Sequence, residues 1–539
     1  MNKTSMGYRV FSIIFSVILV FVSIFVIFQL FKLQILPSNL LIAVSLMIIL
    51  VDIILVILFV FNSHHLWSKI VSSILVIATS VVFGIGNVYL YSTDSTLEKV
   101  TTVSGTVKNT VSVIALSSGS DDLQDYSGST IGVLKTIDKS GTKKSLKDIK
   151  KQGVSISSNQ YDNVPSLIKA LYNGDVSAIV LNEAYRQNVV EMDDYNNFDS
   201  ETKIVHQTIF YTKDKNDALA VSDITSKPFT VLISGNDSYG NLEEVSRSDV
   251  DMLLTINPVT STILMVSIPR DSYVEEVCDD YACNYGVTDK LTHTGIYGVD
   301  TTKDTIENLL DIDINYTFRV NFTSAIDIID TLGGVDVEVA EGLAVSKFYT
   351  DCSLEGVHEG TNHLDGKRAL AYARERKAYL DGDVQRARNQ QQVLQAMIKK
   401  ATSSAILTKY TSLLKAISGA FDTNMSMDEI TSFIKYQIQA MPNWKFENYV
   451  LKGDNDLQVS PELGTEVSVV MLYESSISTA TKKINAVLNG ESSDTVEAEE
   501  DVPAGTVSEE QIEAQIQEGI AEYEAYLANG GEPIDTSGN

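Results

Sequence analysis

Three long apolar runs dominate the N-terminal part of the chain. They comprise residues 8–31, 40–61 and 70–91. Apart from Arg9 at the edge of the first run and Asp52 in the second, they carry no charge. As a helix, each run is long enough to cross about 30 Å of hydrocarbon, and the first is too long for a signal peptide. The pattern therefore predicts three transmembrane helices within residues 1–91.

Basic residues around these runs indicate an orientation. Lys3 and Arg9 precede the first run, and Lys69 lies in the loop between the second and the third. The loop between the first and the second run contains only Lys32. Because basic residues favour cytoplasmic loops, we expect a short cytoplasmic N-terminus in a multi-pass cell-membrane protein. Everything after Tyr91 would then lie on the outer side of the membrane.

Beyond the apolar runs, short strand-like segments alternate with helical periodicity. VSVIAL, TIGVLKT and VSAIVLNE have the composition of strands, and residues 164–174 have that of a helix ended by Gly174. Strands that alternate with helices are typical of α/β domains. We therefore predict an extracytoplasmic accessory α/β domain at residues 111–226, after a Ser/Thr-rich linker at residues 92–110.

A second α/β pattern occupies residues 227–488. Its predicted strands are FTVLISG (229–235), STILMVSIPRDS (261–272), YTFRVNF (316–322) and VDVEVA, and its predicted helix is SAIDIIDTLGG (324–334). The segment VDMLLTI fits either a helix or a strand. A long helix is expected to begin at Asp383 and to continue to about residue 418.

The last part of the chain, residues 489–539, is acidic. Residues 491–539 contain fourteen acidic residues and no Lys or Arg, a composition that favours disorder. Within them, residues 508–527 fit either a solvated helix or a helix that docks on a partner. The formal charge of the whole chain, −29 at pH 7, argues against nucleic acid as a partner.

Three cysteines are present, Cys278, Cys283 and Cys352. Outside the cytoplasm a disulfide is permitted, and Cys278 and Cys283 are the nearest pair in sequence. The sequence leaves open whether this pair is bonded or reduced. Since no histidine lies at ligand spacing from these cysteines, a metal site built on them is not expected.

Within this acidic chain, one segment gathers positive charge. YARERKAYLDGDVQRARNQQ, residues 372–391, holds five cations on either side of Asp381–Gly382–Asp383. These cations are Arg374, Arg376, Lys377, Arg386 and Arg388. We refer to residues 372–391 as the arginine segment.

Further charged residues lie near the ends of predicted strands, where ligands bind in open α/β sheets. They are Asp237, Arg247, Asp249, Arg270 and Asp271. Guanidinium groups bind phosphate oxygens in a bidentate manner. Carboxylates beside a phosphate repel it unless a divalent cation lies between them. The mixture therefore predicts a diphosphate site with a metal ion.

Helix geometry divides the arginine segment. From Asp383 onward, Arg386, Gln390, Val393 and Met397 recur at helical spacing and are expected to share the face that becomes buried. A phosphate near the N-terminus of this helix would provide a partner for a buried Arg386. Arg388 is expected to point away from that face.

A nucleophile motif is not evident. The chain contains no G-x-S-x-G, and His293 is the only histidine near a charged cluster, where it is as well explained by a structural role as by that of a base. Phosphoryl transfer, however, depends mainly on positioning and charge neutralisation.

Taken together, the motifs resemble the LytR–CpsA–Psr family. The resemblance rests on SRSDVDMLLT, VSIPRDS, DKLTHTGIYG, LGGVDVEV and the arginine segment, in this arrangement, over residues 227–400. The three spans and the accessory domain resemble those of its capsule-associated members. The resemblance implies an α-β-α phosphotransferase domain with a central mixed sheet at residues 227–488.

The resemblance also implies an activity. Such proteins use Mg²⁺, with Mn²⁺ as an alternative ion, to move a glycopolymer from a polyprenyl-diphosphate carrier to peptidoglycan outside the membrane. Capsule-assembly membrane proteins are further partners that it suggests.

Carried over by motif, Asp237 and Asp249 are the expected metal ligands. The expected diphosphate contacts are Arg247, Arg270, Arg374, Arg386 and Gln390. Asp271 and Arg376 match motif positions as catalytic candidates. Some members carry an acidic residue where this chain has Ala378 and Tyr379, so the resemblance does not assign the general base.

A second function fits the same residues. A non-catalytic regulator of capsule assembly would also bind a polyprenyl diphosphate, but it would not need the aspartates or an acceptor groove. A transcriptional regulator is disfavoured, because the expected topology leaves no cytoplasmic DNA-binding domain.

Overall fold

The computed structural model describes residues 6–33, 38–61, 66–100, 106–213, 217–236, 246–278, 283, 285–403 and 421–497. Asp237, the tail helix expected at residues 508–527 and most of the second half of the long helix expected from Asp383 lie outside them. By its internal contacts the chain divides into two compact units, residues 1–332 with 399–498, and residues 333–398 with 499–539. Each unit is considered separately.

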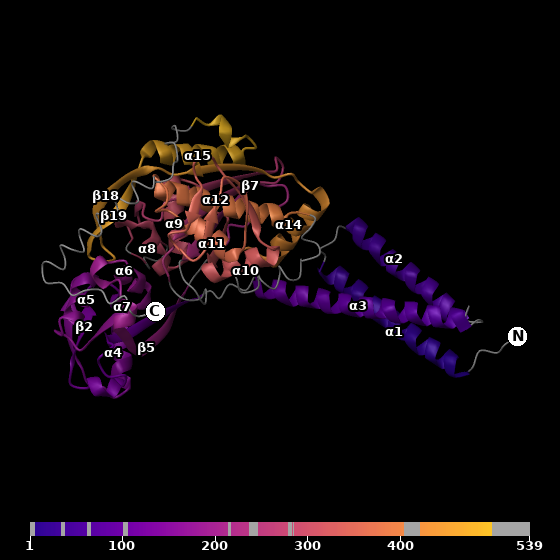
Figure 1. The fold of residues 1–539 in the computed structure, drawn as a ribbon, viewed down its shortest axis with the longest axis horizontal. Helices are drawn as coiled ribbons and strands as arrows, with labels where there is room; N and C mark the ends of the chain where they lie inside the picture. Colours follow the sequence, from indigo (N-terminus) through magenta and orange to yellow (C-terminus); the bar gives the residue numbers. More distant parts are fainter. Residues whose placement is uncertain are drawn as a thin grey trace. The chain divides into compact units, whose positions relative to one another are not determined.

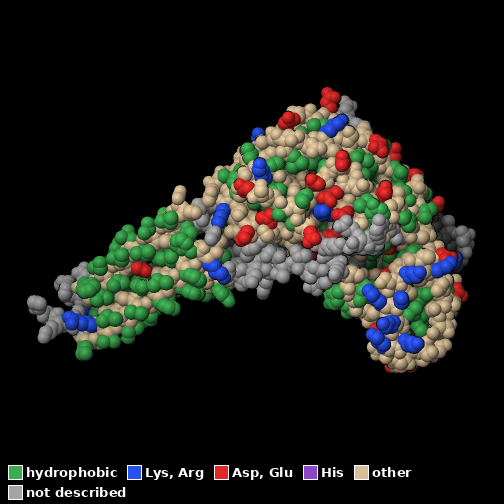
Figure 2. Space-filling view, turned by 180° about the vertical axis from the view of Figure 1, so that it is seen from behind, with side chains coloured by type: hydrophobic (Ala, Val, Ile, Leu, Met, Phe, Trp, Pro, Cys, Tyr) green, Lys and Arg blue, Asp and Glu red, His purple; other side chains and the backbone are tan. Residues whose placement is uncertain are grey.

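Three helices in the first unit are long and apolar enough to cross a membrane, as predicted. They are α1 (Met6–Leu33), α2 (Ser38–Val56), which continues as a π-helical turn to Phe61, and α3 (Leu66–Val100). On the face shown in Figure 2, hydrophobic side chains cover them. Parts of the segment predicted as a linker, residues 92–110, have regular structure, since α3 continues to Val100 and strand β1 begins at Thr106.

The accessory domain is built on a five-stranded mixed sheet, in the order β3-β2-β4-β1-β5. The strands are β1 (Thr106–Leu116), β2 (Thr130–Leu134), β3 (Ser157–Tyr161), β4 (Ala178–Asn182) and β5 (Thr202–Lys213). The helices are α4 (Lys139–Lys151), α5 (Val164–Tyr172), α6 (Arg186–Val190) and α7 (Phe198–Glu201). Ile149 of α4 and Leu167 of α5 belong to different hydrophobic clusters, which lie on opposite faces of the sheet. The predicted α/β architecture of this domain is confirmed.

Asp138 caps the N-terminus of α4, and its carboxyl group is expected to make the stability of the folded protein depend on pH. Its Oδ1 accepts a hydrogen bond from the Gly141 amide at 3.0 Å. Burial raises the pKa of Asp138 to about 6 although hydrogen bonds from Gly141 and Asn182 oppose the shift. Between the unfolded pKa of 3.8 and about 6, the folded state retains a proton that the unfolded state loses, so stability falls as pH rises. We expect Asp138→Asn, which keeps the cap, to remove up to about 3 kcal/mol of this dependence. Melting temperatures of both proteins from pH 4 to 7 test it, and parallel curves would contradict it.

A six-stranded mixed sheet forms the second domain of the first unit, in the order β16-β11-β6-β7-β8-β17. Its strands are β6 (Phe229–Asn236), β7 (Val250–Asn257), β8 (Thr262–Ile268), β11 (Tyr316–Asn321), β16 (Phe421–Thr423) and β17 (Lys445–Val450). β6, β7 and β8 are antiparallel neighbours, whereas β11 and β17 run parallel to β6 and β8. VDMLLTI is therefore a strand, and the predicted mixed sheet is confirmed. We call this part the six-stranded domain.

Helices cover both faces of this sheet. α9 (Val299–Leu310) and α15 (Glu474–Leu488; Figure 1) pack on one face, where Ile306 and Ile484 are fully buried. α14 (Met427–Ala440) packs on the other, and the ring of Phe433 meets Phe229 edge-on at 6.0 Å. Further elements are α10 (Phe322–Leu332), α8 (Leu291–Thr294), β9 (Tyr273–Glu275), β10 (Thr288–Lys290), β18 (Gly453–Ser460) and β19 (Thr465–Leu472).

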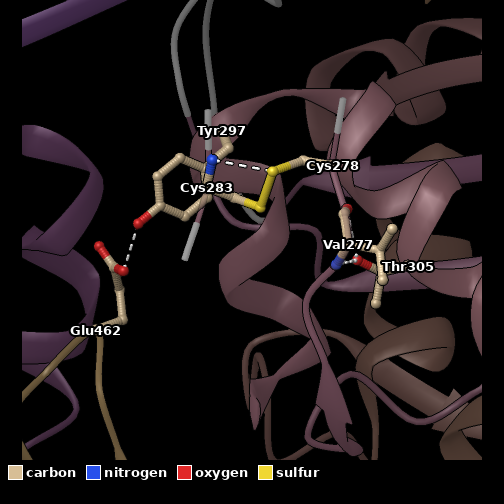
Figure 3. Close-up of a disulfide and its surroundings, with 6 residues drawn as sticks. All are labelled: Val277, Cys278, Cys283, Tyr297, Thr305 and Glu462. Atoms are coloured by element: carbon tan, nitrogen blue, oxygen red, sulfur yellow. Dashed lines mark hydrogen bonds between the residues drawn. A yellow bond between two sulfur atoms is a disulfide. The ribbon is translucent and has the colours of Figure 1, made fainter. Parts of the chain in front are cut away.

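The accessory and six-stranded domains share a hydrophobic cluster. Leu167 packs in the same cluster as Ile296 and Leu463 of the six-stranded domain. Beside it, Glu462 is buried and accepts hydrogen bonds from Tyr185 of the accessory domain and from Tyr297, the latter at 2.6 Å (Figure 3). The contact between the domains is therefore packed and hydrogen-bonded.

Cys278 and Cys283 form a disulfide, which settles the question that the sequence left open (Figure 3). Next to it, the amide and carbonyl of Val277 both bond to the Thr305 hydroxyl on α9, at 3.1 and 3.2 Å. Cys352 is exposed and not bonded to another cysteine.

The described part of the second unit consists of small strand pairs and two helices. The strands are β12 (Val335–Val339), β13 (Val345–Lys347), β14 (Glu355–Val357) and β15 (Gly360–Leu364). β12 pairs with β15, and β13 with β14. The helices are α11 (Gly366–Arg374) and α12, which begins at Gly382 and ends at Ala401 in the first unit. α11 and the start of α12 carry the arginine segment.

Candidate functional site

Strand pairing brings two of the predicted site residues, Asp249 and Arg270, together. Asp251 of β7 pairs with Ile268 of antiparallel β8, so the start of β7 and the end of β8 lie at the same sheet edge. Asp249 directly precedes β7, and Arg270 follows β8. The Asp249 amide also donates to the carbonyl of Gly235, near the end of β6, at 2.7 Å. Residues distant in sequence therefore meet because of the register of the sheet.

Asp249 lies at the centre of this group. Its Oδ1 accepts hydrogen bonds from Arg270 Nη1 at 2.8 Å and from the Thr292 hydroxyl at 3.1 Å, and it lies 3.8 Å from Arg247 Nη2. Burial alone would raise the pKa of Asp249, but the two guanidinium charges outweigh it and hold the pKa below its usual value. Asp249 is therefore ionised at neutral pH.

Arg247 is paired with a residue of the accessory domain that the sequence did not suggest. Its Nη1 and Nη2 donate to the two carboxylate oxygens of Glu191, at 2.9 and 3.0 Å. Glu191 also lies 3.9 Å from Arg270 Nη2. The Arg247 side chain is 5% exposed and that of Glu191 is 40% exposed, so the carboxylate forms the outer side of the pair. An anion thus already binds in the fork that we predicted for a phosphate.

Asp271 lies on the other side of Arg270. Its carboxylate accepts a hydrogen bond from Lys290 Nζ at 2.9 Å and lies 3.6 Å from Arg270 Nε. Lys290 ends β10, within the motif DKLTHTGIYG.

In the same motif, His293 is fully buried and its Nδ1 lies 3.1 Å from Asp289. This burial favours a structural role for His293.

In the second unit, the arginine segment folds as helix, loop and helix. Arg374 ends α11 and is half-buried, while Arg376 in the loop is exposed. Asp383 Oδ1 lies 3.0 Å from Arg386 Nη2 and 3.6 Å from Arg376 Nη1, so one carboxylate aligns two guanidinium groups. A Cβ atom at Gly382 would lie 2.6 Å from the Arg376 carbonyl oxygen, which explains the glycine between Asp381 and Asp383.

The predicted phase of α12 is wrong by about one position. Val393 of the predicted face is buried, but Arg386, Gln390 and Met397 are only half-buried. The other buried residues are Gln385, Asn389 and Ala396, which form a stripe with Val393, and Gln391, which lies off this stripe. Asn389 turns inward because its side-chain amide donates a hydrogen bond to the Tyr372 carbonyl at 3.0 Å. Gln385 lies on the same face, and its side-chain amide donates to Asn389 Oδ1 at 2.9 Å. At 3.6 residues per turn, Arg386 and Gln390 lie on one flank of this stripe and Arg388 on the other. The expected separation of Arg386 from Arg388 therefore remains.

The carboxylates near the sheet fit a metal ion in part. Among the described residues, no three His, Cys, Asp or Glu side chains are grouped as a metal site. Arg270, Thr292 and Arg247 all contact Asp249 through Oδ1, and none of these three contacts involves Oδ2. Mg²⁺ commonly binds one or two carboxylates together with phosphate oxygens. Asp249 fits such an ion as one ligand, whereas Asp237, the second predicted ligand, lies outside the described residues.

Comparison with known sequences identifies a family. The model of the LytR_cpsA_psr family matches residues 194–465. A protein of Bacillus licheniformis named polyisoprenyl-teichoic acid–peptidoglycan teichoic acid transferase TagU is 32% identical over 289 residues, which cover 53% of this chain and 85% of that protein. A protein of the same name from Bacillus anthracis is 35% identical over 269 residues, 49% of this chain and 79% of the relative.

Solved structures give a weaker similarity. TagT of Bacillus subtilis superposes with a TM-score of 0.39 at 28% identity, covering 51% of this chain and 97% of TagT. A LytR-CPS2A-psr family protein with bound octaprenyl pyrophosphate lipid superposes with a TM-score of 0.38 at 26% identity, covering 51% and 97%.

Proposed function

Because this chain belongs to the LytR–CpsA–Psr family, we propose that it is a membrane-anchored phosphotransferase. It moves a capsular or other cell-wall glycopolymer from a polyprenyl-diphosphate carrier to peptidoglycan. The observation that carries this proposal is the placement of Arg247 and Arg270 around Asp249 at one edge of the sheet. The names of the TagU relatives support the same class of reaction.

The arginines supply the chemistry that such a transfer needs. Arg247 and Arg270 bind diphosphate oxygens and neutralise charge that develops in the transition state. The arginine segment of the second unit is predicted, by its motif, to supply further phosphate contacts. The acceptor hydroxyl oxygen forms a bond to the phosphorus that carries the glycopolymer. The bond from this phosphorus to the bridging oxygen breaks, and polyprenyl phosphate leaves. The hydroxyl proton is released in the same step, and Asp271, oriented by Lys290, is our candidate acceptor.

Asp249, with Asp237, would hold Mg²⁺ or Mn²⁺ beside the diphosphate. When bound, such an ion neutralises phosphate charge and orients the phosphate oxygens. Arg270 and Thr292 fix the Asp249 carboxylate from its Oδ1 side, which leaves Oδ2 for the cation.

We place the accessory and six-stranded domains outside the cell, with the N-terminus in the cytoplasm. The Cys278–Cys283 disulfide supports this placement, because disulfides persist in oxidising compartments. The domains, peptidoglycan and the lipid-linked polymer then all lie on the same side of the membrane.

Transfer by the purified full chain tests the proposal. The chain in lipid nanodiscs is incubated with a polyprenyl-diphosphate-linked polymer and peptidoglycan, with Mg²⁺ or with EDTA. We expect polymer covalently attached to peptidoglycan only with the metal. Tight lipid binding without any transfer, under both conditions, would favour the non-catalytic regulator instead.

Replacing Glu191 should strengthen binding of the lipid diphosphate. Glu191→Gln removes the charge that occupies the fork of Arg247, so a phosphate no longer competes with a carboxylate. For a partly exposed pair we expect roughly a two- to fivefold lower Kd for a short-chain prenyl diphosphate. Asp194→Asn, an exposed acid on the same domain, is the matched control. Equal affinities of parent, Glu191→Gln and Asp194→Asn would show that Glu191 does not compete.

A further inference from the structure

The accessory domain carries a row of lysines that the proposed reaction does not use. Lys139, Lys143, Lys147 and Lys151 recur every fourth residue along α4, so they share one face of the helix. All four are exposed, as is neighbouring Lys150. With a rise of about 6 Å per four residues, they form a row about 18 Å long. We call these five residues the lysine stripe. Figure 2 shows basic side chains gathered on the accessory domain.

This row is unexpected in a chain with a formal charge of −29. Like charges four residues apart destabilise a helix, so the arrangement has a cost unless an anion offsets it. Within the part of the chain that the structure describes, no carboxylate forms an ion pair with these lysines. The one acidic residue of α4, Asp148, instead bonds to His206 Nε2 at 2.9 Å. The lysine stripe is therefore available to an external anion.

The composition of the helix indicates what kind of anion fits. Ile149 is buried in the domain, and Leu146 packs against the same cluster, so α4 keeps no large apolar side chain on the lysine face for insertion into a lipid layer. Lysines are flexible point charges, whereas the diphosphate site uses arginine forks. Evenly spaced lysines therefore suit a hydrated chain with repeating negative charges rather than one fixed headgroup.

We propose that the lysine stripe binds the glycopolymer part of the lipid-linked substrate through negative charges repeated along that polymer. The inference rests on the proposed transfer function, and it adds a polymer-binding surface on the accessory domain. The arginine sites hold the diphosphate end, while the stripe binds a portion of the polymer beyond it.

Binding of polyanions by the full chain tests this proposal apart from catalysis. The chain in zwitterionic nanodiscs is titrated with fluorescent polyglycerol phosphate and, separately, with dextran of similar length. Lys143→Gln with Lys147→Gln is compared with Lys445→Gln and Lys482→Gln, which remove the same charge from exposed positions of the six-stranded domain. We expect roughly a three- to tenfold higher Kd for the first variant, a shallower salt dependence, and no measurable dextran binding.

Each outcome is informative. Equal Kd values for the two double variants, or equally tight dextran binding, would overturn the proposal while leaving the transferase function intact. If the Lys143→Gln, Lys147→Gln variant loses affinity for vesicles containing phosphatidylglycerol but binds the polymer as the parent does, the stripe is a membrane contact. That result would overturn the proposal as well. Stripe-dependent polymer binding in a chain that transfers nothing would support the stripe and contradict the proposed function.

Discussion

Asp249→Asn should nearly abolish transfer of the polymer to peptidoglycan, with a loss of roughly a hundredfold or more. Asparagine keeps the shape of the side chain and can still accept the hydrogen bond from Thr292. It removes the charge that pairs with Arg270 at 2.8 Å and that would bind the cation. The measurement is the initial transfer rate at saturating Mg²⁺, with melting temperatures to verify folding.

Asp251→Asn, two residues away on β7, is the matched control. Asp251 is buried and accepts a hydrogen bond from the Ser248 hydroxyl at 2.6 Å. Burial raises the pKa of Asp251 well above its usual value and so favours the neutral acid, which asparagine resembles in shape and charge. We expect a rate close to that of the parent. Full activity of Asp249→Asn, or full activity of the parent in EDTA, would contradict the metal role of Asp249.

Arg386→Ala should lower the transfer rate by roughly ten- to a hundredfold, the usual effect of losing a charge-assisted contact to phosphate. Arg386 is held by Asp383 at 3.0 Å, near the N-terminus of α12 where backbone dipoles also favour an anion. Arg386→Lys keeps the charge but loses the bidentate fork, so it should be impaired as well. Transfer rates are measured for both variants at matched folding stability.

Arg388→Ala provides the comparison, since Arg388 lies on the opposite flank of the buried stripe of α12. We expect at most a fivefold effect, roughly 1 kcal/mol, for this change. If Arg388→Ala is the crippled variant and Arg386→Ala is near normal, the diphosphate lies on the other flank of the helix.

The fold was largely predictable because its strands are short, strongly apolar and bounded by polar loops. FTVLISG and YTFRVNF became β6 and β11, and residues 164–174 became α5. The helical or extended state of VDMLLTI was not predictable, since an unbroken apolar run fits both. The end of α3 was misjudged because Ser and Thr after Tyr91 resemble a linker in composition, whereas the helix continues through them.

The grouping of candidate site residues was predictable where a motif identified them and not elsewhere. Arg247, Asp249, Arg270 and Asp271 were found from their positions near strand ends, and the structure groups them as expected. Glu191 lies in another domain, in a segment without a motif, and only tertiary contact relates it to Arg247. The phase of α12 was missed because Gln385 and Asn389, two polar residues, are buried through hydrogen bonds that periodicity of apolar residues does not detect.

The shared cluster around Leu463 determines how this protein can be truncated for experiments. Leu463 packs with Leu167 of the accessory domain, and Glu462 receives a hydroxyl from each side of the contact, from Tyr185 and from Tyr297. Excision of residues 106–213 would expose apolar surface and leave a buried carboxylate with one donor fewer. Excision of the accessory domain is therefore expected to lower the stability of the six-stranded domain. Substitutions on one side of this contact are likewise expected to disturb packing on the other side as well.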